Sequence, residues 1–261
     1  MAVQVICEAS KNFINREGMT VPEALENAKK LAWYAKDCGG DIFKTQCHVL
    51  EDEAKKRHTK RHTWIRLNEI LTPFDTFWKP LKEYCDEIGI EMLVTPMSRL
   101  AAIKINPLVI RFKVASPDIL DYDLLAYLKS TGKEIILSSG MTEKRDQQKA
   151  KEFLERNYYI LHCVSEYVCP LERMNLYEVA YYDGLSDHSK SLITGALAVM
   201  KGAKIIEKHF TFSNWGKDAN VSLSPEELKV YIQNIRDAEK TLLINERPTK
   251  IEKETLKDFW I

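Results

Sequence analysis

The chain of 261 residues lacks a long apolar segment, a net charge and a leader-like start. Its longest apolar run, near Leu192–Met200, is interrupted by Thr194 and Gly195 and is too short to cross a bilayer, which takes about 18 apolar residues. Glu8 and Lys11 break the only apolar stretch near the N-terminus, which argues against a secretory signal. Because 38 basic residues balance 38 acidic ones, we expect no nucleic acid among the partners, and because the apolar runs are short, we expect no membrane.

The chain also lacks the cysteine spacing of a zinc site or of a disulfide framework. None of the six cysteines belongs to a CxxC pair, which argues against a structural zinc. Cys7, Cys47 and Cys163 instead lie inside apolar runs that are typical of buried strands. We therefore expect reduced thiols and a cytoplasmic protein.

Short β-branched runs alternate with longer segments of helical periodicity along the chain. The expected strands are Val3–Glu8, Asp41–Cys47, Glu91–Pro96, Val109–Ala115, Glu134–Ser138, Tyr158–Val164, Tyr182–Ser186 and Lys204–Phe210. Thr20, with Glu23 three residues later, predicts the start of the first helix. Pro225 does the same for the last helix, whereas Glu172–Ala180 carries the weakest helical signal.

Eight strand–helix units in this length predict an α/β fold, a (β/α)8 TIM barrel, with one domain over residues 1–243 and a C-terminal tail over 244–261. The alternative is an open doubly wound sheet, which usually carries a glycine-rich phosphate loop after its first strand. Residues Glu8–Asn12 contain no such loop. The basic stretch Lys55–His62 predicts either a solvated loop or an active-site loop that attracts an anionic substrate. Phe259 and Trp260 in the tail predict that the tail docks onto a surface.

Polar side chains follow every predicted strand. In a barrel the C-terminal strand ends meet at one rim, where catalytic groups lie, and polar groups cost several kcal/mol if they are buried without partners. Lys44, Lys113 and Lys208, with several hydroxyls, suit a small multiply charged anion such as a phosphorylated carboxylate. His188 and His209 end neighbouring strands about 4.8 Å apart, so they are either hydrogen-bonded core residues or ligands of one divalent metal.

Several motifs follow one another in the order typical of a known enzyme family. The motifs are Ile6–Glu8, Lys44–Gln46, Thr95–Arg99, Phe112–Ser116, Ile136–Met141, Leu161–Tyr167, Gly184–Ser189 and Glu207–Thr211. With them the chain resembles the N-acetylneuraminate (sialic acid) synthase family over roughly residues 3–243. The resemblance implies a synthase that condenses phosphoenolpyruvate with an aldehyde sugar, such as N-acetylmannosamine, to give a 2-keto-3-deoxy sugar acid and phosphate.

The resemblance also implies site residues and a metal. The implied catalytic residues are Glu8, Lys44, His188 and His209, and the implied substrate-binding residues are Lys113, Ser116, Ser138, Ser139, Ser165, Tyr167, Ser186 and Asp218. His188 and His209 would hold a divalent metal, which is Mn²⁺, Mg²⁺ or Co²⁺. Most of the lysines and serines would hold phosphoenolpyruvate, whereas Ser165, Tyr167 and Asp218 would face the sugar.

The chain departs from the family on the side of the sugar. Where the family usually has a glycine followed by Asn-His after the first glutamate, this sequence has Ala9–Phe13, a longer loop with Phe13 in place of the histidine. Phe13 predicts either a neutral loop change or altered sugar contacts. Lys217 stands where a proline is usual. We also expect no C-terminal antifreeze-like domain, which in typical members sends an arginine into the sugar site of the partner.

Two other functions stay open on the sequence. The same chemistry could act on a different, anionic aldehyde, with Lys55, Arg57 and Lys60 contacting that acceptor. Alternatively, the chain is a non-catalytic subunit that needs a separate lid protein, although none of the implied metal or lysine residues is missing. Beyond the two substrates, the implied partners are a second copy in a homodimer or a separate chain that carries the lid domain.

Overall fold

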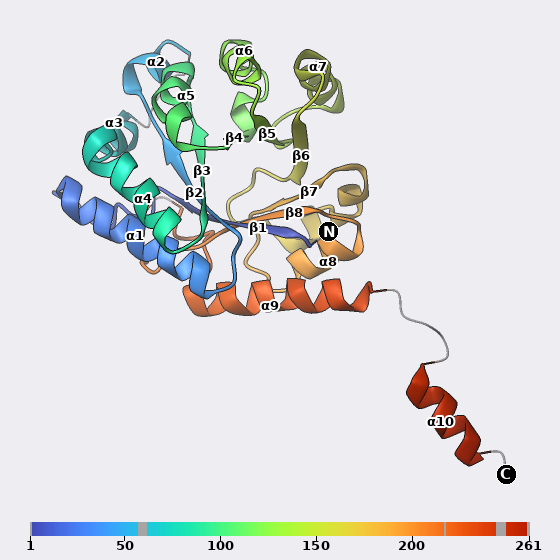
Figure 1. Ribbon diagram of the computed structural model, residues 1–261. Coiled ribbons are helices and arrows are strands. Elements are labelled where there is room, and N and C mark those ends of the chain that lie inside the picture. Colours follow the sequence, from blue (N-terminus) through green and yellow to red (C-terminus); the bar gives the residue numbers. More distant parts are fainter. Residues whose placement is uncertain (1, 57–61, 217, 244–248, 260–261) are drawn as a thin grey trace.

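Eight parallel strands close into a barrel in sequence order (Figure 1). The computed structural model describes residues 2–56, 62–216, 218–243 and 249–259. The strands are β1 (Gln4–Ser10), β2 (Ile42–Cys47), β3 (Glu91–Pro96), β4 (Arg111–Val114), β5 (Glu134–Ser138), β6 (Tyr158–Cys163), β7 (Gly184–Asp187) and β8 (Ile205–His209). Because β8 pairs with β1, the barrel has no open edge. The predicted (β/α)8 TIM barrel and its eight strands are confirmed.

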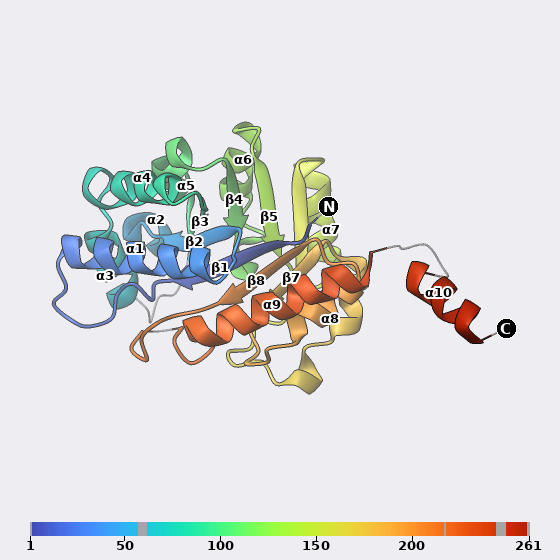
Figure 2. The ribbon, with the colours of Figure 1, turned by 60° about the horizontal axis from the view of Figure 1, so that its bottom comes forward.

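Helices follow the strands, and most of them cover the outside of the barrel (Figures 1 and 2). The α-helices are α1 (Val21–Asp37), α2 (Leu50–Ala54), α3 (His62–Leu71), α4 (Lys79–Glu87), α5 (Arg99–Ile105), α6 (Tyr122–Ser130), α7 (Lys144–Leu154), α8 (Thr194–Met200), α9 (Pro225–Thr241) and α10 (Lys250–Phe259). The short elements are the π-helix η1 (Phe74–Trp78) and the 3₁₀ helices η2 (Asn106–Leu108), η3 (Ser116–Asp118), η4 (Leu171–Arg173) and η5 (Leu176–Tyr181). The sixth connection, where the helical signal is weakest, thus holds only η4 and η5.

Capping boxes begin the two longest helices, α1 and α9. The Thr20 hydroxyl accepts a hydrogen bond from the Glu23 backbone N–H, and the Glu23 carboxylate accepts one from the Thr20 N–H at 2.8 Å. Ser224 and Glu227 make the same reciprocal pair at α9. These bonds satisfy backbone donors that a helix start leaves unpaired. The predicted starts of both helices are confirmed.

Side chains inside the barrel form three layers. At the N-terminal end, the Arg111 guanidinium donates to Glu91 at 2.6 Å and to Glu134 at 2.9 Å. The apolar layer above them consists of Ile6, Ile42, Leu93, Ile136, Leu161 and Ile205. Because alternate residues of a strand point to the same side, Glu8 and Lys44, two residues beyond Ile6 and Ile42, also point inward. The alternation along the strands therefore places a layer of polar side chains next to the apolar layer, toward the C-terminal end of the barrel.

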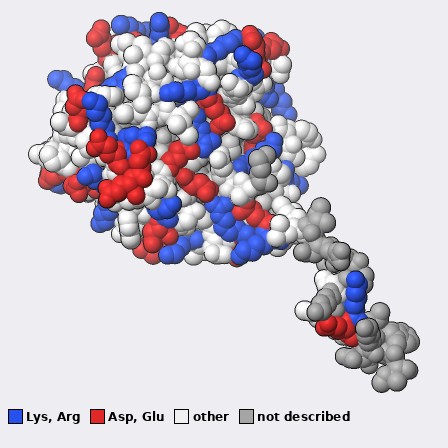
Figure 3. Space-filling model, viewed as in Figure 1, with Lys and Arg blue, Asp and Glu red and all other residues white. Residues whose placement is uncertain are grey.

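The outer surface carries charges of both signs, and Figure 3 shows them interspersed over one face of the barrel. All six cysteines are buried and free. Within the described ranges, no helix combines the length and the apolar composition that crossing a membrane requires.

Helix α10 lies away from the barrel in both ribbon views. Residues 244–248 and 260–261 of the predicted tail lie outside the described residues, so the division at residue 243 stays a prediction.

Candidate active site

A polar cavity opens at the C-terminal end of the barrel. Its lining residues are Glu8, Lys44, Gln46, Thr95, Lys113, Ala115, Ser116, Pro117, Ser138, Met141, Cys163, Ser165, Tyr167, Ser186, His188, Glu207 and His209. Every strand or the loop after it contributes at least one of them. The structure thus brings together all of the predicted site residues except Ser139, Lys208 and Asp218.

Ser139 and Asp218 lie next to the cavity without lining it. Ser139 follows the inward-facing Ser138, and its carbonyl accepts hydrogen bonds from Thr142 at 2.8 Å and Gln147 at 3.3 Å. Of the two serines, the geometry therefore favours Ser138 as the one that faces a substrate. Asp218 accepts a hydrogen bond from the Ser10 hydroxyl, which ties the loop after β8 to the end of β1.

Lys208 was expected among the anion-binding lysines, and the structure places it elsewhere. Its ammonium lies 2.9 Å from Asp187 Oδ2, and both side chains are fully buried. Tyr231 of α9 donates to the same carboxylate at 2.9 Å, so this pair lies between the barrel and its helices. The reason is the strand period of two: Glu207 and His209 point inward, and Lys208 between them must point outward.

Glu207 is the central residue that the sequence reasoning missed. Its Oε1 lies 3.5 Å from the Lys44 ammonium and its Oε2 lies 3.9 Å from that of Lys113, and Ser186 donates to it at 3.2 Å. Burial alone would raise the pKa of Glu207, but Lys113 and Lys44 lower it to about 2. The signal was present in the sequence, since Glu207 stands two residues before His209 and so shares its inward face.

Lys44 and Glu8 form a buried ion pair at the floor of the cavity. The Lys44 ammonium contacts Glu8 Oε2 and donates to the Thr95 hydroxyl at 3.0 Å. Burial raises the pKa of Glu8 to about 7, and nearby Glu207 adds to the rise, although Lys44 opposes it. Glu8 can therefore gain or lose a proton near neutral pH, as a general acid or base must.

Lys113 is the second ammonium of the cavity. It donates to the Ser138 hydroxyl at 2.5 Å and to the Val114 carbonyl at 2.9 Å. Burial lowers its pKa, although Glu207 opposes that shift. Two ammonium groups with hydroxyls around them make this side of the cavity a site for a small anion with more than one charged group.

Gly140 has no side chain, and this leaves space beside the hydroxyls of Ser116 and Ser165. An added Cβ there would lie 2.1 Å from Ser165 Oγ, 2.8 Å from Ser116 Oγ and 3.1 Å from Cys163 Sγ. Three cavity-lining groups thus converge on a position where any side chain would collide with them. Cys163 was expected only as a buried thiol, and the structure adds it to the lining of the cavity.

Two imidazoles form the other side of the cavity. The rings of His188 and His209 are 5.3 Å apart between centroids, and Tyr167 stacks on His188 at 4.2 Å. His188 Nδ1 lies 2.8 Å from the Val164 carbonyl and must donate to it, so the lone pair of this ring is on Nε2. Burial lowers the pKa of His209 to about 3, and a proton on His188 would add to this effect, so the His209 ring is neutral.

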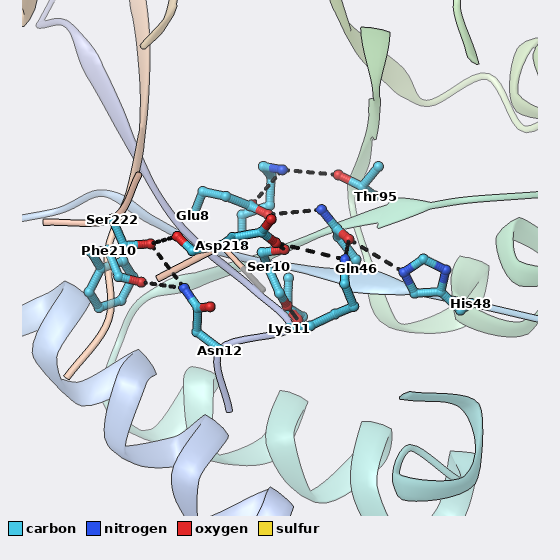
Figure 4. A network of polar contacts seen from close by, with 12 residues as sticks. Glu8, Ser10, Lys11, Asn12, Gln46, His48, Thr95, Phe210, Asp218 and Ser222 are labelled. Atoms are coloured by element: carbon cyan, nitrogen blue, oxygen red, sulfur yellow. Dashed lines mark hydrogen bonds and ion pairs between the residues drawn. The ribbon is translucent and has the colours of Figure 1, made fainter. Parts of the chain in front are cut away.

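A polar network lies beside the cavity and joins β1, β2 and the loop after β8 (Figure 4). Lys11 donates to Gln46 Oε1, and Gln46 Nε2 lies 3.5 Å from Glu8 Oε1. The Lys11 ammonium is also 3.8 Å from Asp218 Oδ2. His48 Nε2 lies 3.4 Å from the same oxygen of Gln46. Figure 4 shows these side chains converging on Gln46 from different elements.

The two sequence features that suggested altered sugar contacts differ in their outcome. Phe13 is fully buried, with its ring 5.1 Å from that of Phe77, so it packs in the core and has no surface to offer a sugar. Residues 57–61 of the basic stretch lie outside the described residues. Two described members of the stretch pair with nearby acids: Lys56 donates to Asp121 at 2.9 Å, at the start of α6, and the Lys55 ammonium lies 3.6 Å from Glu51.

Comparison with known proteins identifies the family. Residues 32–246 match the NeuB family. The chain belongs to the NeuB family. It is 30% identical over 244 residues to the N,N'-diacetyllegionaminic acid synthase of Campylobacter jejuni, and the match covers 84% of this chain and 73% of that protein. It is 29% identical over 242 residues to the human N-acetylneuraminate-9-phosphate synthase, with 84% and 67% covered.

A solved structure agrees with the NeuB assignment. The N-acetylneuraminic acid (sialic acid) synthetase of Leptospira borgpetersenii serovar Hardjo-bovis, crystallised in complex with citrate, has a TM-score of 0.84 and 25% identity to this chain. The match covers 98% of this chain and 91% of that one. The predicted membership in the sialic acid synthase family is confirmed, and with it the class of enzyme, a transferase that forms carbon–carbon bonds from phosphoenolpyruvate.

His188 and His209 are the two side chains that would bind a divalent metal ion in this cavity. Among the described residues, no group of three or more His, Cys, Asp or Glu side chains is placed to hold a metal ion. The chemistry of the pair nevertheless fits a divalent cation, because His209 is neutral and its buried Nδ1 has no hydrogen-bond partner in the described part of the chain. The Val164 carbonyl fixes the tautomer of His188, as hydrogen bonds commonly do behind metal ligands. Water and substrate would supply the other ligands.

Proposed function

We propose that this chain is a metal-dependent synthase that condenses phosphoenolpyruvate with an aldehyde sugar of the N-acetylmannosamine type. The products are a 2-keto-3-deoxy sugar acid and phosphate. The observation that carries the proposal is one cavity with two buried ammonium groups, Lys44 and Lys113, on one side and the imidazoles of His188 and His209 on the other. We further predict a cytoplasmic location. A homodimer and a chain that needs a separate lid protein both stay open, and light scattering of the purified chain distinguishes them.

The chain's own residues account for the binding of phosphoenolpyruvate. Lys44 and Lys113 would hold its phosphate and carboxylate, with the cavity-lining hydroxyls completing the contacts. Because these donors are already fixed by Thr95 and Ser138, they need little rearrangement as charge develops. A bound divalent metal at His188 and His209 would supply Lewis-acid polarisation of the aldehyde oxygen.

The reaction forms one carbon–carbon bond, adds one water, and breaks the bond between C2 and the phosphate oxygen. C3 of phosphoenolpyruvate bonds to the aldehyde carbon, and positive charge develops at C2. Water adds at C2, and Glu8 accepts its proton, which requires the carboxylate form of Glu8. The oxygen of the former aldehyde takes up the proton that Glu8 accepted. Collapse of the tetrahedral intermediate forms the C2 carbonyl and breaks the C2–O bond to phosphate, which leaves with the proton of the C2 hydroxyl.

Phosphate release tests this function directly. The protein is incubated with phosphoenolpyruvate, Mn²⁺ or Mg²⁺, and a panel of N-acylated hexosamine aldehydes. We expect phosphate release that depends on both the aldehyde and the metal, and His188→Ala should weaken Mn²⁺ binding as measured by calorimetry. The absence of turnover with every aldehyde, together with unchanged Mn²⁺ binding in His188→Ala, would contradict the proposal.

Glu8 should set the pH dependence of the reaction. Because Glu8 acts as a carboxylate and its pKa is raised to about 7, kcat/KM should rise with pH through about 7. Glu8→Gln should lower kcat about 100-fold or more and remove that inflection. Glu166→Gln is the matched control, since Glu166 pairs with Arg173 outside the cavity. An inflection near pH 7 that persists in Glu8→Gln would show that another group titrates.

Gly140→Ala should obstruct the binding of phosphoenolpyruvate. The new methyl group would collide with Ser165 and Ser116, so we expect KM for phosphoenolpyruvate to rise about tenfold or more. Steady-state kinetics with saturating aldehyde measure the effect, and the thermal midpoint reports whether the fold is kept. A lower midpoint with unchanged KM would show that Gly140 serves packing alone.

A further inference from the structure

Lys11 is a buried cation that the chemistry above does not use. It follows the last residue of β1 and is only 8% exposed. The register of β1 against β2 shifts between Glu8 and Ser10, and Ser10 has a φ of 50°, in the left-handed region. This bulge brings Lys11 beside the end of β2, where its ammonium meets the carboxamide of Gln46.

The contact with Lys11 decides which way the Gln46 amide faces. An ammonium can only donate hydrogen bonds, so the carbonyl oxygen of Gln46 must face Lys11. His48 Nε2 also lies 3.4 Å from this oxygen, but His48 Nδ1 donates to Glu53 at 2.9 Å, so Lys11 alone sets the orientation. The NH₂ group therefore faces Glu8, whose Oε1 lies 3.5 Å away. An amide nitrogen carries two hydrogens, and Gln46 lines the cavity, so one N–H is left for a substrate.

Lys11 itself is not placed to bind a substrate. It is not among the residues that line the cavity, and Asp218, 3.8 Å from its ammonium, balances its charge. Its effect on the reaction must therefore pass through Gln46. The reversed amide would put the Gln46 oxygen against the carboxylate of Glu8, and Lys11 disfavours that state by holding the oxygen on its own side.

We propose that Lys11 is a positioning residue that locks Gln46 as a hydrogen-bond donor into the cavity on the side of Asp218, the residue that the family resemblance assigns to the sugar. The locked amide selects an aldehyde that presents an oxygen acceptor, a hydroxyl or an acyl carbonyl, at this point. This inference rests on the proposed function for its kinetic consequence, whereas the orientation of the amide does not depend on it.

Kinetics of two substitutions test the consequence. Lys11→Met should raise KM for the aldehyde about tenfold, the effect expected when a charge-assisted hydrogen bond is lost, and leave KM for phosphoenolpyruvate unchanged. Lys11→Arg should restore most of the affinity, because a guanidinium also only donates. Lys104→Met is the control, since the Lys104 ammonium donates to the Thr72 carbonyl away from the cavity. Equal effects of Lys11→Met on both substrates would overturn the proposal.

The side-chain amide signals of Gln46 in ¹⁵N-correlated NMR spectra test the orientation without turnover. They are assigned by their loss in Gln46→Glu. We expect them to shift in Lys11→Met and to stay near their wild-type positions in Lys11→Arg and Lys104→Met. Unchanged signals in Lys11→Met would overturn the inference, whatever the kinetics. If the wild type turns over no aldehyde, the proposed function fails, and these spectra alone decide the inference.

Discussion

Lys44→Met should lower kcat/KM for phosphoenolpyruvate about 1,000-fold, measured as phosphate release. The Lys44 ammonium is buried between Glu8, Glu207 and Thr95, so it is the cation that a bound anion meets at the floor of the cavity. Without it, an entering phosphate or carboxylate group would face two acidic side chains with only Lys113 to oppose them. The loss should therefore appear with phosphoenolpyruvate whatever the aldehyde.

Two controls separate substrate binding from neutralisation of the site. Lys133→Met removes an ammonium that donates to the Asn106 and Val109 carbonyls outside the cavity, and it should leave kcat/KM within about twofold of the wild type. The double variant Lys44→Met/Glu207→Gln removes one carboxylate as well. If that double variant recovers activity, Lys44 serves only to balance Glu207, and its proposed contact with phosphoenolpyruvate is wrong.

Asp187→Asn should destabilise the barrel by about 3–5 kcal/mol, because it leaves the buried Lys208 ammonium without its counter-ion. The carboxylate also accepts hydrogen bonds from Thr194 at 2.5 Å, Tyr231 at 2.9 Å and the Ser189 N–H at 2.8 Å. It therefore joins β7 and β8 to α8 and α9. For a chain of this size the thermal midpoint should fall by about 10 °C, measured by circular dichroism.

The same carboxylate gives this stabilisation a pH dependence. Lys208 and the hydrogen bonds lower the pKa of Asp187 against the effect of burial. A carboxyl with a lowered pKa in the fold stabilises at all pH values above its ordinary range, and the contribution is lost as the pH falls through the lower folded value. The difference between Asp187→Asn and the wild type should thus be full at neutral pH and shrink in acid.

The surface of α9 supplies the matched substitution for Asp187. Asp237→Asn removes a carboxylate that pairs with Lys240 on the exposed face of this helix, and the midpoint should not change measurably. The double variant Asp187→Asn/Lys208→Met no longer has an unpaired buried ammonium. Its thermal midpoint should therefore lie between those of Asp187→Asn and the wild type. A midpoint for Asp187→Asn equal to that of the wild type would show that the pair contributes nothing to stability.

The fold could be predicted because each strand and helix carries its own local signals. Alternating and apolar runs mark all eight strands, and Thr20 with Glu23 marks the start of α1. The polar rim could be predicted as well, since parallel strands place their C-terminal ends together. Lys208 shows the limit of a prediction from position along a strand, because neighbouring residues at the same strand end face opposite sides of the barrel wall. The strand period itself separates Lys208 from Glu207.

The sequence by itself determined the repeat, the barrel and the residues that reach its C-terminal rim, because strand period, helix capping and chain order are local properties of the residues. Only the tertiary structure decided which of these residues meet. Glu207 stands between Lys44 and Lys113, from three different strands, and Lys11 reaches Gln46 across a bulge. Phe13 packs on Phe77 far along the chain. Such contacts depend on how the barrel closes and how its loops pack, and the spacing of residues along one chain does not encode those distances.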